Sequence, residues 1–145
     1  MREYSEKPLV GVGALIIRDD KVLLVKRANE PNKGKWSIPG GVVKLGESLI
    51  DALKREVIEE TGLEVDVLDV ACVSEEIVRD DEGVKFHYVI IDFFADVVGG
   101  ELKVGSDVEE AKWVGFDELD SIEIVDFVKK LIENVKMESK RIYLK

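Results

Sequence analysis

Three glutamates in a segment with helical spacing are the residues of this sequence best suited to chemistry. Glu56, Glu59 and Glu60 fall within an arc of about 100° on a helical wheel. Glu56 and Glu60 form a like-charge pair at i,i+4, which destabilises a helix unless something compensates. One interpretation is a solvated acidic face. The other is a site for a divalent cation, because Mg²⁺ binds oxygen ligands and keeps water and substrate phosphates around it.

The residues around these glutamates predict a loop, then a helix, then a stop. An apolar stripe at helical spacing consists of Leu49, Ile50, Leu53 and Val57. Ser48 or Glu47 can open the helix, and Gly62 stands where a left-handed C-cap belongs. The glutamates therefore lie beside the stripe, on a helix whose apolar side faces a core.

Length, charge and cysteine content restrict the class of protein. We expect residues 1–145 to form a single domain, large enough to bury a core. The formal net charge of -10 at pH 7 argues against binding to nucleic acid, because the phosphate backbone would be repelled. Cys72 is the only cysteine, and the apolar run Val10 to Ile17 is too short to span a membrane. We therefore expect a cytoplasmic protein without a membrane partner.

The rest of the chain alternates strand and turn signals and has one more helical pattern. Leu9 to Arg18 and Lys21 to Arg27 predict a hairpin, and Lys85 to Val98 is the strongest strand signal. Glu101 to Val104 is a candidate for the next hairpin strand. Ile124 to Val135 predicts a helix, capped by Asp120 or Ser121. This order predicts an α/β protein with a mixed sheet between helices.

Residues 41–63 resemble the Nudix box of the MutT/Nudix hydrolase family. The signature is Gly, five residues, Glu, seven residues, Arg-Glu, an aliphatic residue, any residue, Glu-Glu, any residue, Gly and an aliphatic residue. It is filled without departure by Gly41, Glu47, Arg55, Glu56, Val57, Glu59, Glu60, Gly62 and Leu63. Residues 34–40 resemble the segment before the box, and residues 111–119 resemble the family's late strand and helix.

The resemblance implies a Nudix-type α/β/α sandwich with a mixed β-sheet and a loop-helix-loop catalytic box. It also implies Mg²⁺-dependent hydrolysis of a phosphoanhydride bond in a nucleoside diphosphate linked to another moiety, with Mn²⁺ as a substitute metal. By resemblance the metal ligands and catalytic carboxylates are Glu56, Glu59 and Glu60, assisted by the Gly41 carbonyl. Glu60 is expected to be the principal ligand and the carboxylate nearest the attacking water.

Two further roles follow from the resemblance. Glu47 and Arg55 are expected to orient the catalytic carboxylates, an arrangement that is common around metal sites. In many family members a carboxylate outside the box supplies the base or another ligand. Glu109 and Glu110 are the candidates for that role here, and Asp107 lies in the same loop.

Three residues outside the box are candidates for substrate binding. Arg27 ends a predicted strand just before a loop, where it contacts a phosphate or simply lies on the surface. Trp36 either stacks on a base or fills the core, and the core is the favoured alternative. His87 is the only histidine and alternates with core positions on a strand, which favours a structural role over substrate contact.

The substrate is chosen by residues outside the box. No proline follows Pro39, although ADP-ribose enzymes of the family often have one about fifteen residues after the final glycine of the box. The resemblance therefore favours a (deoxy)nucleoside triphosphate, including oxidised forms, cleaved to monophosphate and pyrophosphate. An ADP-ribose or nucleotide-sugar pyrophosphatase is the alternative. A non-catalytic nucleotide-sensing domain is a third, which the intact box disfavours, and a homodimer is left open.

Overall fold

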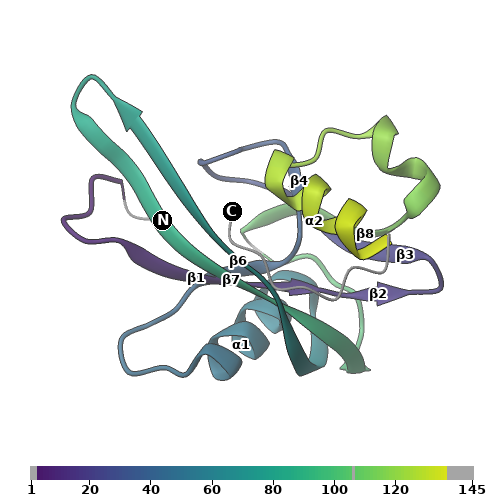
Figure 1. The fold of residues 1–145 in the computed structure, drawn as a ribbon. Helices are drawn as coiled ribbons and strands as arrows, with labels where there is room; N and C mark the ends of the chain where they lie inside the picture. The colour runs from purple at the N-terminus through teal and green to yellow at the C-terminus, as the bar shows by residue number, and fades with distance from the viewer. Residues whose placement is uncertain (1–2, 106, 137–145) are drawn as a thin grey trace.

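The first of two β-sheets is four-stranded and mixed. The computed structural model describes residues 3–105 and 107–136. The order in this sheet is β5 (Gly40–Val42), β1 (Leu9–Leu15), β7 (Gly83–Gly100) and β6 (Leu63–Asp80). The pair β1–β7 is parallel, whereas β1–β5 and β6–β7 are antiparallel. The strands β6 and β7 form a long hairpin that projects beyond the rest of the fold (Figure 1).

A second sheet is built around β3 (Lys21–Arg27). It pairs antiparallel with three strands, which are β2 (Ile17–Arg18), β4 (Trp36–Ser37) and β8 (Val108–Gly115). The chain passes from β1 in the first sheet to β2 in the second with one residue between them, Ile16, which is buried. Short connections of this kind hold the two sheets against each other.

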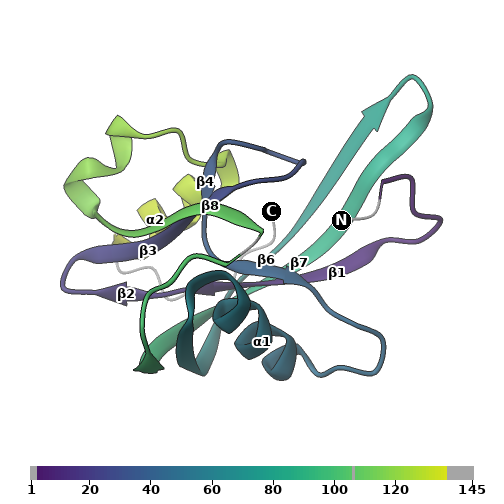
Figure 2. The same ribbon diagram turned by 180° about the vertical axis from the view of Figure 1, so that it is seen from behind.

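Helices cover opposite sides of these sheets (Figures 1 and 2). They are α1 (Leu49–Thr61) and α2 (Asp126–Lys136), with a 3₁₀ helix, η1 (Phe116–Ser121), before α2. Because strand side chains alternate between faces, neighbours on β1 contact different helices. Ala14 shares a buried cluster with Leu53 of α1, and Leu15 shares another with Leu131 of α2.

Local chemistry at both ends of α1 sets its length. The Ser48 hydroxyl accepts a hydrogen bond of 3.1 Å from the Asp51 amide, which satisfies a free donor in the first turn. Gly62 has φ 75° in the left-handed region, and its amide donates to the Ile58 carbonyl. Leu53 and Val57 of the predicted apolar stripe are buried, whereas Ile50 is 48% exposed, so the prediction for Ile50 is wrong. Glu56 and Glu60, beside the buried residues, lie against strand β5.

These observations confirm the expected α/β fold with a mixed sheet between helices. The prediction of a strand at Glu101 to Val104 is wrong, because the structure has no strand there. The Lys103 amide donates to the Thr61 carbonyl and the Gly105 amide to the Glu60 carbonyl, so this segment is held against the end of α1. Among the described residues, none of the helices combines the length and apolarity needed to cross a bilayer.

Candidate active site

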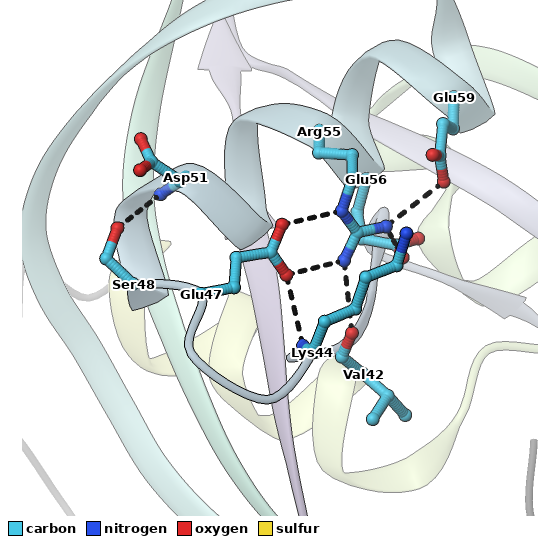
Figure 3. Close-up of polar contacts among 8 residues, drawn as sticks. All are labelled: Val42, Lys44, Glu47, Ser48, Asp51, Arg55, Glu56 and Glu59. Atoms are coloured by element: carbon cyan, nitrogen blue, oxygen red, sulfur yellow. Dashed lines mark hydrogen bonds and ion pairs between the residues drawn. The ribbon is translucent and has the colours of Figure 1, made fainter.

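Arg55 connects the carboxylates of the loop and of helix α1. Its guanidinium donates Nε and Nη2 hydrogen bonds of 2.8 and 2.9 Å to the two oxygens of Glu47, a bidentate pair (Figure 3). Its Nη1 donates to Glu56 at 2.6 Å and to Glu59 at 3.2 Å, and Nη2 also reaches the Val42 carbonyl. One cation therefore fixes three carboxylates and the loop before the helix.

Glu47 closes this network on the loop side. The Arg55 hydrogen bonds, helped by the Lys44 amide, lower the pKa of Glu47 to about 2. The same contacts raise the pKa of Arg55. Both side chains are thus charged at any working pH, and the pair holds its geometry without depending on a metal.

Glu56 lies directly over the backbone of the preceding loop. A Cβ atom at Gly41 would collide with the Glu56 carboxylate, so a larger residue there would displace that carboxylate. Burial raises the pKa of Glu56, and the neighbouring Arg55 offsets this in part. The close approach brings the peptide group of residue 41 next to a carboxylate that is poorly solvated.

Glu60 is the more strongly perturbed carboxylate. Its Oε1 accepts a hydrogen bond of 2.9 Å from the Gly40 amide. Burial nevertheless raises its pKa to about 8, and the charge of Glu56 adds to the effect while Arg27 opposes it. Strongly perturbed carboxylates in a cleft are typical of functional sites.

A cleft with two connected lobes runs past these residues. The carboxylate lobe contains Glu56, Glu60 and Asp107. The floor lobe contains Gly11, Gly13, Tyr88, Ile90 and Asp92. Both lobes are also lined by the residues of a shared strip, which are Arg27, Ile38, Gly40, Gly41 and Val42.

The donor atoms of the carboxylate lobe fit a hard divalent cation. Glu56 and Glu60 offer oxygen ligands only, and the charge of each is disfavoured by burial, which a cation would relieve. Within residues 3–105 and 107–136, however, no group of three His, Cys, Asp or Glu side chains is arranged around a metal position. Glu59 instead faces Arg55 and is half exposed.

The other predicted residues are distributed unevenly around the cleft. Arg27 lines both lobes, and its Nε donates to the Pro31 carbonyl at 2.6 Å. Glu109 and Glu110 are exposed on β8 outside both lobes, and Glu109 lies 3.8 Å from the Lys26 ammonium. Asp107, from the same segment, is the carboxylate that enters the cleft.

Neither aromatic candidate for substrate binding lines the cleft. Trp36 is buried in the core on β4, with the Lys112 ammonium 4.7 Å from its ring centroid. His87 is half-buried on β7 opposite Ile77. The adjacent Tyr88 enters the floor lobe instead, because successive strand residues point to opposite faces.

Sequence reasoning missed Asp92 as a candidate site residue. It lies on β7 within an apolar run and is only 1% exposed. An acidic residue with apolar neighbours on both sides was the available signal, because an aspartate is rarely buried without a partner or a role.

Comparisons with known proteins agree with this geometry. Residues 7–135 match the sequence profile of the NUDIX domain. An ADP-ribose pyrophosphatase from Methanocaldococcus jannaschii is 43% identical over 112 residues, which are 77% of this chain and 64% of that protein. A human 8-oxo-dGDP phosphatase is 32% identical over 108 residues, or 72% of this chain, and the chain spans only 31% of its length.

A similar fold has been solved. The crystal structure of a MutT Nudix hydrolase from Burkholderia pseudomallei is 32% identical in sequence and superposes with a TM-score of 0.79. The match covers 90% of this chain and 99% of that one. The profile match over most of the chain, the intact box and the shared fold lead to one conclusion: this chain belongs to the Nudix hydrolase family.

Proposed function

We propose that this protein hydrolyses the phosphoanhydride bond of a nucleoside diphosphate linked to a sugar, with ADP-ribose as the first candidate. The observation that carries the proposal is the two-lobed cleft. The carboxylate lobe and the floor lobe are both lined by the shared strip, so a diphosphate on this strip would extend a group into each lobe. A substrate with two organic ends joined by a diphosphate matches that shape.

In this proposal the protein contributes in two ways: it orients the carboxylates and it neutralises phosphate charge. Arg27 presents a cation to both lobes and would neutralise a phosphate on the strip. The Gly40 amide orients Glu60 through Oε1, and Arg55 orients Glu56 from the opposite side. Phosphoanhydride hydrolysis needs little more than such positioning and charge stabilisation around the phosphates.

Glu56, Glu60 and the Gly41 carbonyl are the groups that would hold a divalent cation, with Glu59 available beside them. When bound, Mg²⁺ or Mn²⁺ neutralises phosphate charge and lowers the pKa of a coordinated water. Asp107 is the carboxylate outside the box that is placed to accept a proton from the attacking water, in preference to Glu109 and Glu110. This assignment follows from position in the cleft.

The choice of substrate rests on the relatives. The absent proline favours a triphosphate, whereas the 43% identical relative is named an ADP-ribose pyrophosphatase, and this similarity outweighs one missing marker. A nucleoside triphosphate or an oxidised deoxynucleotide is the second candidate, supported by the 8-oxo-dGDP phosphatase relative. The two candidates differ in their second product. Cleavage of ADP-ribose releases a sugar phosphate, whereas cleavage of the second candidate releases inorganic phosphate or pyrophosphate.

A hydrolysis panel tests the proposal. Wild type and Glu60→Gln are incubated with Mg²⁺ and ADP-ribose, nucleotide sugars, dinucleoside polyphosphates, or canonical and oxidised nucleoside triphosphates, and products are separated by chromatography. AMP and ribose 5-phosphate as the preferred products, absent with the variant, are the expected result. Faster cleavage of a triphosphate to monophosphate and pyrophosphate would replace ADP-ribose with the second candidate.

A further inference from the structure

The connection between β7 and β8 runs past the C-terminal end of α1 (Figure 2). We call its first part, residues 101–105, the strap. The Lys103 amide donates a hydrogen bond of 2.7 Å to the Thr61 carbonyl, and the Gly105 amide donates one of 3.1 Å to the Glu60 carbonyl. The last carbonyls of a helix have no partner within the helix. The strap therefore supplies donors to two carbonyls that α1 leaves open, which holds it against the helix.

Gly105 lies directly against the backbone of α1. A Cβ atom on residue 105 would collide with the Glu59 carbonyl oxygen and would lie 2.9 Å from the Glu59 carbonyl carbon. Gly105 does not have a positive φ, so glycine is needed at this position for space and not for backbone conformation. The obstructing atoms belong to a packed helix rather than to a flexible side chain. A side chain on residue 105 would therefore push the strap away from the helix.

Asp107 is held between two anchors. It follows Gly105 by two positions, so their Cα atoms are at most about 7 Å apart. On its other side Val108 is buried and pairs with Arg27 of β3. Both α1 and β3 contribute residues to the carboxylate lobe, which Asp107 also lines. Burial raises the pKa of Glu60 and the charge of Asp107 adds to this effect, which is consistent with two carboxylates that face each other across the lobe.

We propose that Gly105 is a positioning residue for catalysis, because its contact with the last turn of α1 sets how far Asp107 reaches into the carboxylate lobe. This inference rests on the proposed function, in which Asp107 accepts a proton from the attacking water. Gly105 has no side chain that could touch a substrate, so its effect on the rate passes through Asp107. Misplacement of a reacting group by about 1 Å lowers a rate by up to about 100-fold.

A double-mutant cycle tests the proposal. Gly105→Ala, Asp107→Asn and the double variant are compared with wild type on the panel substrate that wild type cleaves fastest. Gly105→Ala is expected to lower kcat about 10-fold and to change KM less than about twofold, because Asp107 is displaced while the substrate contacts remain. In the Asp107→Asn background the same substitution is expected to change kcat less than about twofold, since no base is left to displace.

Gly115→Ala is the matched control at the other end of β8. The nearest atoms to a Cβ there are in the carboxylate groups of Asp117 and Glu118, which can move aside, so kcat is expected to stay near wild type. The Mg²⁺ concentration for half-maximal rate is also measured on Gly105→Ala. It is expected to match wild type, because the glutamates of α1 stay in place. A higher Mg²⁺ requirement would overturn the proposal by showing that the helix has moved instead of the strap.

A second variant keeps the test decisive if Gly105→Ala does not fold. Lys103→Pro removes the amide that donates to the Thr61 carbonyl and adds no atom to residue 105. It loosens the same strap, so kcat is expected to fall by about threefold to 10-fold, and by less than about twofold in the Asp107→Asn background. Circular dichroism and thermal unfolding show whether each variant is folded.

The inference and the proposed function fail in different ways. An unchanged kcat in folded Gly105→Ala would overturn the inference, and so would losses in kcat that multiply in the double variant, because Gly105 would then act independently of Asp107. If wild type is active and Asp107→Asn is equally active, the inference is wrong while the hydrolysis stands. If wild type cleaves no substrate of the panel, the proposed function is wrong and the inference falls with it.

Discussion

Replacing Glu60 with glutamine is expected to stabilise the metal-free protein while it removes activity. Glutamine keeps the size of glutamate and an oxygen that can accept the Gly40 amide hydrogen bond. It removes the charge that burial disfavours and that the nearby Glu56 carboxylate repels. The variant therefore separates a stabilising change in the fold from the loss of a catalytic carboxylate.

The size and sign of the effect follow from the shifted pKa. The folded-state pKa of Glu60 is about 8, against 4.5 for an unperturbed glutamate. Between these values the folded state binds a proton that the unfolded state has released, so stability falls as pH rises. The loss is about 1.4 kcal/mol for each pH unit and ends above the folded-state pKa. The loss of stability accumulated between the unperturbed pKa and pH 8 is about 4 kcal/mol.

Screening by solvent reduces this loss of stability, because Glu60 is not completely buried. We expect Glu60→Gln to gain about 2 kcal/mol over wild type at pH 8, or roughly 5 °C in Tm, and less than about 1 kcal/mol at pH 5. Thermal and urea unfolding in EDTA at the two pH values measure the difference. Glu59→Gln is the matched control on the same helix, because its side chain is 51% exposed and its change is expected to stay below about 1 kcal/mol.

Two results would refute this reasoning. A destabilised Glu60→Gln protein at pH 8 would mean that the glutamate charge is well compensated in the fold without a metal. A gain in stability of Glu60→Gln that is equal at pH 5 and pH 8 would mean that the gain does not arise from ionisation of Glu60. Addition of Mg²⁺ gives a further check, because a bound cation is expected to raise the Tm of wild type more than that of the variant.

Three other substitutions test separate parts of the site. Arg55→Lys loses the bidentate fork and is expected to lower kcat about 10- to 100-fold with a folded protein by circular dichroism. Asp107→Asn is expected to lower kcat about 100-fold, whereas Glu110→Gln outside the cleft stays near wild type; equal effects would remove Asp107 as the base. Gly41→Ala places a methyl group against Glu56 and is expected to weaken Mg²⁺ activation, seen as a higher Mg²⁺ concentration for half-maximal rate.

Local chemistry made the central helix predictable from the sequence. Ser48 caps α1 through its own hydroxyl and Gly62 ends it in a left-handed conformation, so both ends depend on nearby residues. The late helix was harder. It begins at Asp126, and Ser121 does not cap it because its hydroxyl donates to the Glu118 carbonyl within η1. A cap residue can serve either element, and only the packed structure shows which.

The floor of the cleft could not be predicted in the same way. Tyr88 and Asp92 line the lobe on β7, which pairs with β1, and Gly13 of β1 leaves space beside Asp92. That parallel pairing joins residues far apart in the sequence, and no local pattern specifies it. The entry of Asp107 into the cleft in place of Glu109 and Glu110 likewise depends on where β8 begins and which face it turns inward.

Hydrolysis of ADP-ribose in ¹⁸O-labelled water, followed by mass spectrometry of the products, tests the central claim most directly. The account predicts Mg²⁺-dependent formation of AMP and ribose 5-phosphate, with one labelled oxygen in one of the two phosphates and no turnover by Glu60→Gln. The position of the label identifies the phosphorus that water attacks. Absence of turnover with Mg²⁺ and with Mn²⁺, across ADP-ribose and the nucleoside triphosphates, would contradict the account and favour a nucleotide-binding domain without hydrolysis.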